Sequence, residues 1–421
     1  MIQLASSWQK VRFDQICKNI SNRIDDPKQA NTNYYVGLEH LDSEEPKILR
    51  HGSPQDVSKT KLLFKPGHIL FGKRNWYLRR LAVAQREGIC SAHMLVLEPI
   101  EGKITKEFLP LLMFSDEFYE KALMVSAGSM SPTIKWKDIA KLEFLIPPIP
   151  EQETTLSLTH QIDDAIAKTQ DLLEKTKIYF ISSLKTLVTR GIGHTKFKKV
   201  KWIYGKTIDV PIEWEIRKFD DLFEFLITGT NSRSDLKNNG DIQYIHYGDI
   251  HKKWNYILDC NSEEIPYIDK TKVEKLPLLK DGDLIIVDAS EDYEGSGTSI
   301  LLKNVNNKKI VSGLHTIALH SYDENISLDF KVYLTSIPSV KSQIIRYVTG
   351  ISVYGLSKNN LKKIMIPLPP LPEQKQITSI LSNIQEQISQ QQSHISNLKT
   401  MRKSILNSKL TPKMEEKLVA Q

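Results

Sequence analysis

The chain contains a long internal repeat. The segment PPIPEQ at 147–152 returns as PPLPEQ at 369–374, a shift of 222 residues, and the match continues without a gap into a long helical pattern. A repeat of this size indicates a pseudo-two-fold molecule, because a solenoid is built from more and shorter units. We therefore expect two similar domains, each followed by a long helix.

Composition places the chain among ordinary globular proteins of two to four domains. Of its 421 residues, 40% are hydrophobic and 25% are charged, and the net charge of +7 is compatible with a polyanionic partner. No signal peptide and no apolar run of membrane-spanning length is present. Cys17, Cys90 and Cys260 lack the spacing of a disulfide framework or a zinc site. We expect reduced thiols in a cytoplasmic protein without a membrane partner.

Matching strand-like segments precede the two proline clusters. Trp8–Ile16 resembles Trp214–Leu222, and in both copies a polar Gly turn leads into a buried strand, at 65–71 and at 280–286. The segment 90–97 resembles 311–319. The first part of each repeat is therefore mixed, with short strand-like segments. The expected boundaries are 1–146 and 194–368 for the two globular domains, 147–193 and 369–412 for the proline entries with their helices, and 413–421 for a C-terminal tail.

Each proline cluster predicts the start of a long helix. Glu151 and Glu373 then lie in the first turn, where a negative charge complements the helix dipole. The helices should run from 151 to about 190, before a Gly-Ile-Gly stop signal, and from 373 to about 410, before Pro412.

Both helices carry apolar residues in alternating steps of four and three, the pattern of a coiled coil. We expect the helices to pair with each other; the alternative is that each packs on its own globular half. The predicted seam includes Ile162, Ile166, Leu173, Phe180, Ile384, Ile388, Ile395 and Leu398.

No motif of a catalytic or metal site is present. The sequence lacks the GxxxxGK[ST] phosphate loop, the HExxH zinc motif and the GxSxG nucleophile elbow. Gly295–Gly297 indicates a flexible loop, and Asp281–Asp283 indicates a turn before a strand. We predict no catalytic residue and no metal site.

A basic stretch follows the predicted strand at 69–71. Arg, Lys and Asn are the side chains that contact phosphates and read guanine and adenine edges. The alternative is a solvated hairpin that keeps the protein soluble. The candidate DNA contacts here are Lys73, Arg74, Asn75, Arg79, Arg80 and Arg86.

The equivalent stretch of the second half, 288–296, is acidic. Carboxylates can accept a hydrogen bond from the amino group of cytosine. An acidic stretch therefore suggests that the two halves read different sequences. A lysine run after the first helix either contacts phosphate or is an exposed linker. The candidate contacts in these two stretches are Ser290, Tyr293 and Ser296, and Lys198, Lys199 and Lys201.

The twin PPxPEQ segments, each between a variable globular half and a long helix, resemble the specificity subunit of Type I restriction-modification systems. The run LSKNNL at 356–361 and its counterpart at 133–139 also look like this family. The resemblance covers essentially the whole chain. It implies two target recognition domains of mixed α/β structure that read the two parts of a bipartite double-stranded DNA target. Two antiparallel coiled-coil helices would join them.

The resemblance also implies a subunit without catalysis of its own. It would recruit two methyltransferase (M) subunits and two restriction (R) subunits. It would bind no cofactor directly, because S-adenosylmethionine, ATP and Mg would be bound by the partner subunits. Two readings of other classes remain open: a nuclease or methyltransferase with an unrecognised active site, and a protein-binding scaffold without DNA contact.

Overall fold

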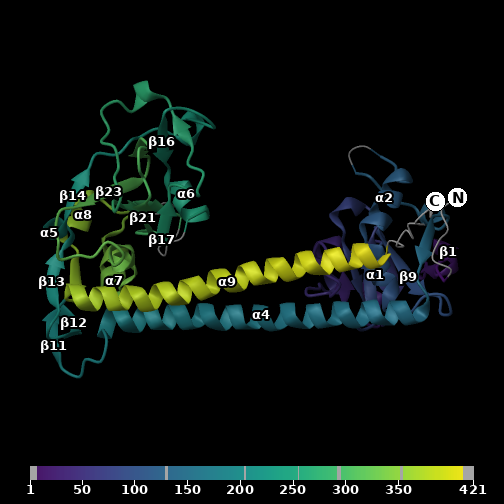
Figure 1. The fold of residues 1–421 in the computed structure, drawn as a ribbon. Helices are drawn as coiled ribbons and strands as arrows, with labels where there is room; N and C mark the ends of the chain where they lie inside the picture. The colour runs from purple at the N-terminus through teal and green to yellow at the C-terminus, as the bar shows by residue number, and fades with distance from the viewer. Residues whose placement is uncertain are drawn as a thin grey trace, which may run out of the picture. The chain divides into compact units, whose positions relative to one another are not determined.

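The computed structural model describes residues 7–128, 131–202, 205–254, 256–291, 295–350 and 354–410. The chain divides into two compact units, Met1–Leu172 with Gln391–Gln421, and Leu173–Gln390. Each unit contains one mixed α/β domain and one segment of each long helix (Figure 1). Within the described ranges, no helix combines the length and the apolar character needed to cross a membrane.

The first unit is built on two four-stranded sheets, ordered β2-β9-β6-β7 and β3-β5-β8-β4, and a short β1-β10 ladder. Between the sheets and the helices, the rings of Phe13, Phe118 and Phe144 lie 5.6–5.8 Å apart and are fully buried. The elements are β1 (Gln9–Arg12), β2 (Cys17–Ile20), β3 (Arg23–Ile24), β4 (Tyr35–Val36), β5 (Lys61–Phe64), β6 (Ile69–Gly72), β7 (Leu81–Val83), β8 (Gly88–Ser91), β9 (Met94–Pro99), α1 (Phe108–Phe114), α2 (Asp116–Met124), α3 (Trp136–Ile139) and β10 (Glu143–Ile146).

The second unit has a five-stranded sheet, β14-β23-β19-β21-β17, a four-stranded sheet, β15-β18-β16-β22, and three two-stranded ladders, β11-β12, β13-β25 and β20-β24. Its elements are β11 (Phe197–Lys201), β12 (Thr207–Pro211), β13 (Glu215–Lys218), α5 (Phe219–Leu222), β14 (Phe223–Leu226), β15 (Leu236–Lys237), β16 (Ile242–Ile245), α6 (Tyr247–Lys252), β17 (Tyr256–Asp259), β18 (Tyr267–Ile268), β19 (Leu284–Val287), β20 (Ala289–Ser290), β21 (Ser299–Lys303), β22 (Ile310–Ser312), β23 (Thr316–Ser321), α7 (Pro338–Tyr347), β24 (Tyr354–Gly355), α8 (Lys358–Lys363) and β25 (Met365–Leu368).

The larger sheets of the two units share one topology. The order β2-β9-β6-β7 returns as β14-β23-β19-β21. The register also repeats, since Ile69 lies opposite Leu97 in the first unit and Leu284 lies opposite Leu319 in the second. The smaller sheets differ: β5 pairs with β8, whereas β18 pairs with β16. The repeat predicted from the sequence is therefore present in three dimensions, with a conserved sheet and a divergent one.

The predicted glycine turns are present before β6 and β19. Gly67 and Gly282 have φ angles of +84° and +83°, a left-handed conformation that glycine adopts without steric cost. After each glycine, a side chain accepts the amide hydrogen of the lysine that opens the turn. His68 Nδ1 accepts from Lys65 at 3.2 Å, and Asp283 Oδ2 accepts from Lys280 at 2.8 Å. A histidine and an aspartate thus fill the same role.

The two long helices are α4 (Ile149–Arg190) and α9 (Leu371–Leu410). Each begins two residues before the predicted start. Pro150 and Pro372 therefore lie in the first turn, where the missing N–H has no partner to lose, rather than before the helix. The start of α4 and the end of α9 belong to the first unit. The end of α4 and the start of α9 belong to the second unit. The helices therefore run antiparallel.

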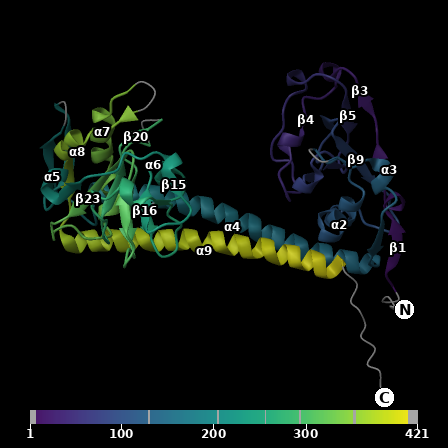
Figure 2. The same ribbon diagram turned by 90° about the horizontal axis from the view of Figure 1, so that it is seen from above.

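Both helices pair with each other and also pack on the globular domains. In the first unit, Arg402 of α9 donates to Asp163 of α4 at 2.6 Å, and Leu406 is part of the domain core. In the second unit, Phe180 and Leu381 share one core cluster, and Figure 1 shows the two helix segments side by side. Figure 2 shows the two long helices from above. The eight residues of the predicted seam are all buried or half-buried: Ile162, Ile166, Leu173, Phe180, Ile384, Ile388, Ile395 and Leu398.

Candidate nucleic-acid interface

The basic loop after β6 is held by backbone hydrogen bonds. The N–H of Lys73 donates to the carbonyl of His93 at 3.1 Å, and the carbonyl of Lys73 accepts from Ile134 at 3.0 Å. A 3-10 turn over Trp76–Leu78 follows. The backbone that carries the charges is therefore fixed, which is what a positioned binding site requires.

Arg74 and Tyr77 are the exposed side chains of this loop, and Tyr77 is 55% exposed. The Arg74 guanidinium donates to the hydroxyl of Ser131 at 3.4 Å. An exposed arginine can contact phosphate, and an exposed tyrosine ring can stack on an unpaired base. Lys73 and Asn75 are half-buried beside them.

Arg79 has a structural environment. Its guanidinium pairs with Glu44 at 3.2 Å and with Asp116 at 2.6 Å, and it lies 4.5 Å from the ring centre of Tyr119. It is half-buried, and its φ of +50° is left-handed. With two carboxylates bound, Arg79 has little left to offer a phosphate, so the prediction of a DNA contact at this position loses its chemical basis.

Arg80 and Arg86 differ from each other in environment. The carbonyl of Arg80 accepts from Gly72 across the β6-β7 pair at 2.9 Å, and its side chain is half-buried. Arg86 lies 4.1 Å over the ring of Tyr34, beyond the end of β7. The six candidate residues of this stretch therefore have different environments.

In the second unit, two predicted contacts are buried. Ser296 is fully buried and its hydroxyl donates to the carbonyl of Tyr354 at 3.2 Å, and Ser290 lies in β20 with 8% exposure. These side chains are not available to a ligand, because the loop folds back on β24. Tyr293 lies outside the described residues.

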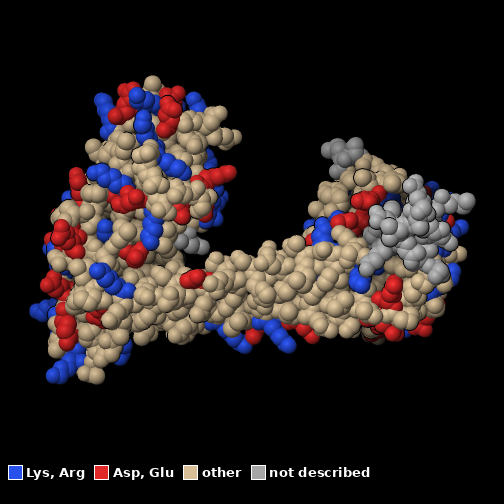
Figure 3. Space-filling model, in the orientation of Figure 1, with Lys and Arg blue, Asp and Glu red and all other residues tan. Residues whose placement is uncertain are grey.

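The candidate residues of the lysine run, Lys198, Lys199 and Lys201, lie in β11, which pairs with β12. Lys198 is held by hydrogen bonds to the carbonyls of Ile212 and Trp214 at 2.9 and 2.6 Å, whereas Lys199 and Lys201 are exposed. The second unit carries both signs of charge interspersed on the face drawn in Figure 3. Charge alone does not mark one binding face.

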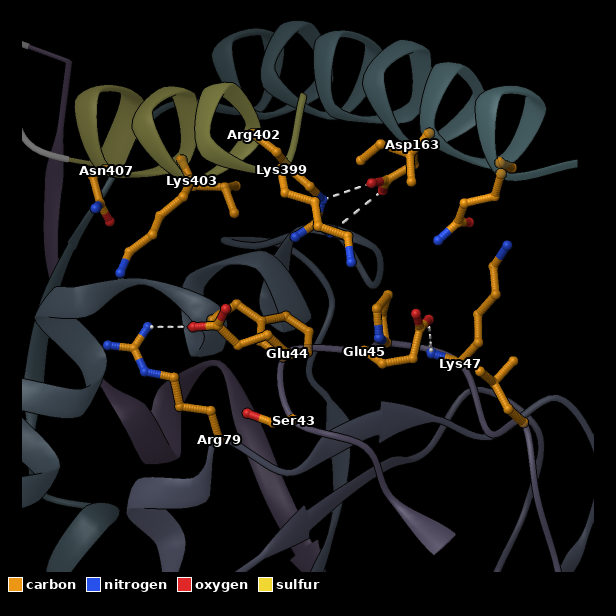
Figure 4. Close-up of a pocket in the computed structure, with 17 residues that line it drawn as sticks. Ser43, Glu44, Glu45, Lys47, Arg79, Asp163, Lys399, Arg402, Lys403 and Asn407 are labelled. Atoms are coloured by element: carbon orange, nitrogen blue, oxygen red, sulfur yellow. Dashed lines mark hydrogen bonds and ion pairs between the residues drawn. The ribbon is translucent and has the colours of Figure 1, made fainter. Parts of the chain in front are cut away.

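A pocket of about 400 Å³ in the first unit is lined by the loop at 43–49 and by both long helices (Figure 4). Acidic and basic side chains face each other across it, and the Arg402–Asp163 and Arg79–Glu44 pairs occupy its walls. This pairing of charges indicates a packing junction between the domain and the helices.

Sequence reasoning missed two exposed histidines, His93 and His315. His93 precedes β9, and its carbonyl accepts a hydrogen bond from the residue that follows β6. His315 precedes β23, and its carbonyl accepts a hydrogen bond from the residue that follows β19. The shift of 222 residues, which also relates the proline clusters, was the available signal.

Comparison with known proteins agrees with this duplicated architecture. A family model described as "Type I restriction modification DNA specificity domain" matches residues 5–178 and 211–399. The EcoDI specificity subunit of Escherichia coli is 26% identical over 188 residues, which cover 41% of this chain and 40% of that protein. The putative MjaX specificity subunit of Methanocaldococcus jannaschii is 24% identical over 379 residues, covering 86% and 81%.

Solved structures share the fold. A chain from a structure of the assembly and conformational transition of the type I R-M system has a TM-score of 0.66 at 18% identity, covering 97% of this chain and 99% of that one. The HsdS subunit from Thermoanaerobacter tengcongensis has a TM-score of 0.51 at 18% identity, covering 97% of each chain. Since the family model matches most of the chain, in two segments that follow the internal repeat, this chain belongs to the Type I restriction-modification DNA specificity family.

Proposed function

We propose that this chain supplies DNA sequence specificity to a Type I restriction-modification complex, with each unit reading one part of a bipartite double-stranded target. The observation that carries this proposal is the match of the DNA specificity model to both halves of the chain. The repeated sheet supports it, because two equivalent frameworks with different loops can read two different sequences.

Catalysis belongs, in this proposal, to partner subunits. Two methyltransferase subunits would bring S-adenosylmethionine, and two restriction subunits would bring ATP and Mg. The relatives are named as specificity subunits, which favours this division over a chain with its own active site. It also favours DNA contact over a scaffold that binds only proteins.

A docking surface for the methyltransferase is offered by α4 within the second unit. Ile178, Tyr179 and Ile181 are 67%, 61% and 65% exposed. Ile178 and Ile181 are three residues apart and therefore share one helix face. Exposed large apolar side chains of this kind are typical of a protein interface, since their burial removes apolar area from water. A partner helix with an apolar face would cover them.

The test is co-expression of the chain with its methyltransferase subunits, followed by single-base mapping of methylation. We expect one bipartite motif in cells with the chain and none without it. Replacing residues 1–146 by the equivalent region of another family member should change one part of the motif and leave the other part intact. A chimera in which both parts change together would show that the units are not independent readers.

The docking surface is tested by the double variant Ile178→Ser/Ile181→Ser, which removes the two exposed isoleucines of one helix face. We expect loss of co-purification with the methyltransferase subunit and an unchanged melting temperature. The matched control is Ile227→Ser, a similarly exposed isoleucine of the same unit, at 67% exposure. Unchanged co-purification of the double variant would contradict this placement.

A further inference from the structure

One site recurs in the two domains with identical backbone bonding. The N–H of Asp288 donates to the carbonyl of His315 at 3.1 Å, and the carbonyl of Asp288 accepts from Leu356 at 2.7 Å. Lys73 makes the same two bonds, with His93 as the first partner. Asp288 is therefore the structural counterpart of Lys73, and His315 is the counterpart of His93.

The charge at this site is inverted between the units. In the first unit, burial lowers the pKa of His93, and the positive charges of Arg74 and Lys73 lower it further. In the second unit, the carboxylate of Asp288 lies 3.3 Å from Nδ1 of His315. One backbone arrangement thus presents cations in the first unit and a carboxylate in the second.

The side chains of both sites are accessible. In the first unit, Arg74 and His93 are exposed. In the second, the side chains of His315 and Asp288 are 45% and 30% exposed, and the ring of Tyr247 stands edge-on 5.1 Å from the His315 imidazole. Each site combines a fixed backbone with a polar edge that solvent reaches.

Charged side chains surround Asp288 in the second unit. Lys358 lies near Asp288, but its ammonium donates to the carbonyl of Leu226 at 2.7 Å. Burial raises the pKa of Asp288, while the charges of His315 and Lys358 oppose this rise. The His315 backbone has a φ of +56°, an uncommon left-handed conformation for histidine, which the bond to Asp288 holds in place.

We propose that Lys73, Arg74 and His93 form the base-reading site of the first unit, and that Asp288 and His315 form the base-reading site of the second. The site of the first unit would donate hydrogen bonds to the acceptor edge of guanine. The site of the second unit would accept a hydrogen bond from the amino group of cytosine or adenine. This inference rests on the proposed function and assigns the chemistry of each half-site.

The donor and acceptor code of the major groove is the physical reason. Lys and Arg donate to O6 and N7 of guanine, while Asp and Glu accept from the N4 amino group of cytosine. A carboxylate placed against O6 and N7 of guanine would face two acceptors and find no donor on that base edge, which disfavours guanine there. Two sites of opposite charge therefore select different bases.

The experiment uses the chain co-expressed with its methyltransferase subunits. The methylated motif is mapped at single-base resolution for the wild type and for Lys73→Gln, Arg74→Gln, Asp288→Asn and His315→Asn. We expect Asp288→Asn to relax one position of one half-site, with discrimination there reduced roughly 5- to 150-fold. Arg74→Gln should do the same in the other half-site. His315→Asn keeps a residue that tolerates the left-handed backbone, and should relax the same position as Asp288→Asn.

The controls are Asp329→Asn and Lys106→Gln, which remove exposed charges elsewhere in the two units, at 52% and 61% side-chain exposure. They should leave the motif unchanged, and melting temperatures verify that every variant folds.

The outcomes separate the two proposals. A wild-type chain that gives no bipartite motif would overturn the proposed function. A wild-type motif that stays intact in all four folded variants would overturn this inference alone. If the first-unit variants weaken binding at every sequence and lower the salt dependence by about one counterion per contact, those cations contact phosphate and do not read a base.

Discussion

Gln152 and Gln374 make the same three hydrogen bonds in the two units. The amide group of Gln152 donates to the carbonyls of Lys103 and Pro147, and its oxygen accepts from the N–H of Thr105. Gln374 makes the equivalent bonds, to the carbonyls of Asn325 and Pro369 and from the N–H of Ser327. Both glutamines are fully buried. The glutamine of PPxPEQ therefore ties the start of each helix to a distant loop of its own domain.

Replacing Gln152 or Gln374 by Ala should destabilise the corresponding unit. Each substitution removes the partner of three backbone groups, one in a buried bond and two in part-buried bonds, and an orphaned buried group costs about 1–3 kcal/mol. We expect a loss of about 3 kcal/mol in the free energy of unfolding, measured by urea denaturation. The exposed glutamines Gln161 and Gln390 on the same two helices are matched controls, and their Ala variants should be nearly neutral. An equal, small effect at all four positions would contradict a role for this network.

Stability of the first unit should fall in mild acid because of His68. Burial lowers the pKa of His68 below its ordinary value of 6.5, and its Nδ1 accepts the amide hydrogen of Lys65. Since the folded-state pKa is the lower one, the stabilisation is complete above about pH 6.5 and is lost as the pH falls below that value. Asn at position 68 can accept the same bond without titrating. His68→Asn should therefore flatten the dependence of the melting temperature on pH between about 7 and 5. An unchanged dependence would mean that other groups cause it.

Arg79→Ala should lower stability without changing the salt dependence of DNA binding. The variant loses the ion pairs to Glu44 and Asp116 and the contact with the Tyr119 ring. We expect a destabilisation of about 2 kcal/mol. Arg74→Ala is the matched comparison, because Arg74 is exposed and its loss should change the free energy of unfolding by less than about 0.5 kcal/mol. The slope of log affinity against log salt for the two variants separates a structural arginine from a DNA-contacting one.

Leu406→Ala should destabilise the N-terminal domain although the residue lies near the C-terminus. Leu406 is 3% exposed and is part of the first unit's core with Phe108 and Phe118. Removal of a buried leucine side chain costs about 2–5 kcal/mol. Hydrogen exchange should show faster exchange in β6 and β9 and unchanged exchange in β19 and β23. The exposed Met401 of the same helix provides the control, and Met401→Ala should be silent. Uniform acceleration in both units would show that they unfold together.

The sequence was informative where the determinants are local. The heptad steps predicted the helix pair, and the Gly turns at 67 and 282 were found because a left-handed turn requires glycine or a close substitute. The environment of Arg79 was not predictable, because its carboxylate partners lie 35 and 37 residues away along the chain. The burial of Ser296 depends on β24, which lies 58 residues further on. Contacts of this kind come from the tertiary fold and leave no periodic signal in the sequence.

Strand register also limited the sequence alignment of the halves. Sequence similarity placed Cys90 opposite Val311 in the comparison of the two halves. In the structure, Cys90 pairs with Val36 and Ser312 pairs with Ile245, so Cys90 corresponds to Ser312. A slip of one residue moves a side chain to the other face of a strand. In the register of the structure, Cys90 and Ser312 are related by the same shift of 222 residues as His93 and His315.

The division of the chain determines the order in which the units can be completed during synthesis. Residues 173–390 are continuous, so the second unit has all its residues once Gln390 has been made. The first unit also needs Leu406 and Leu410, which are translated after Gln390, and until then the apolar surface that they cover remains open. The domain that is synthesised first is therefore completed last. A nascent chain stalled before residue 391 should expose an unfinished N-terminal core to chaperones beside a finished second domain.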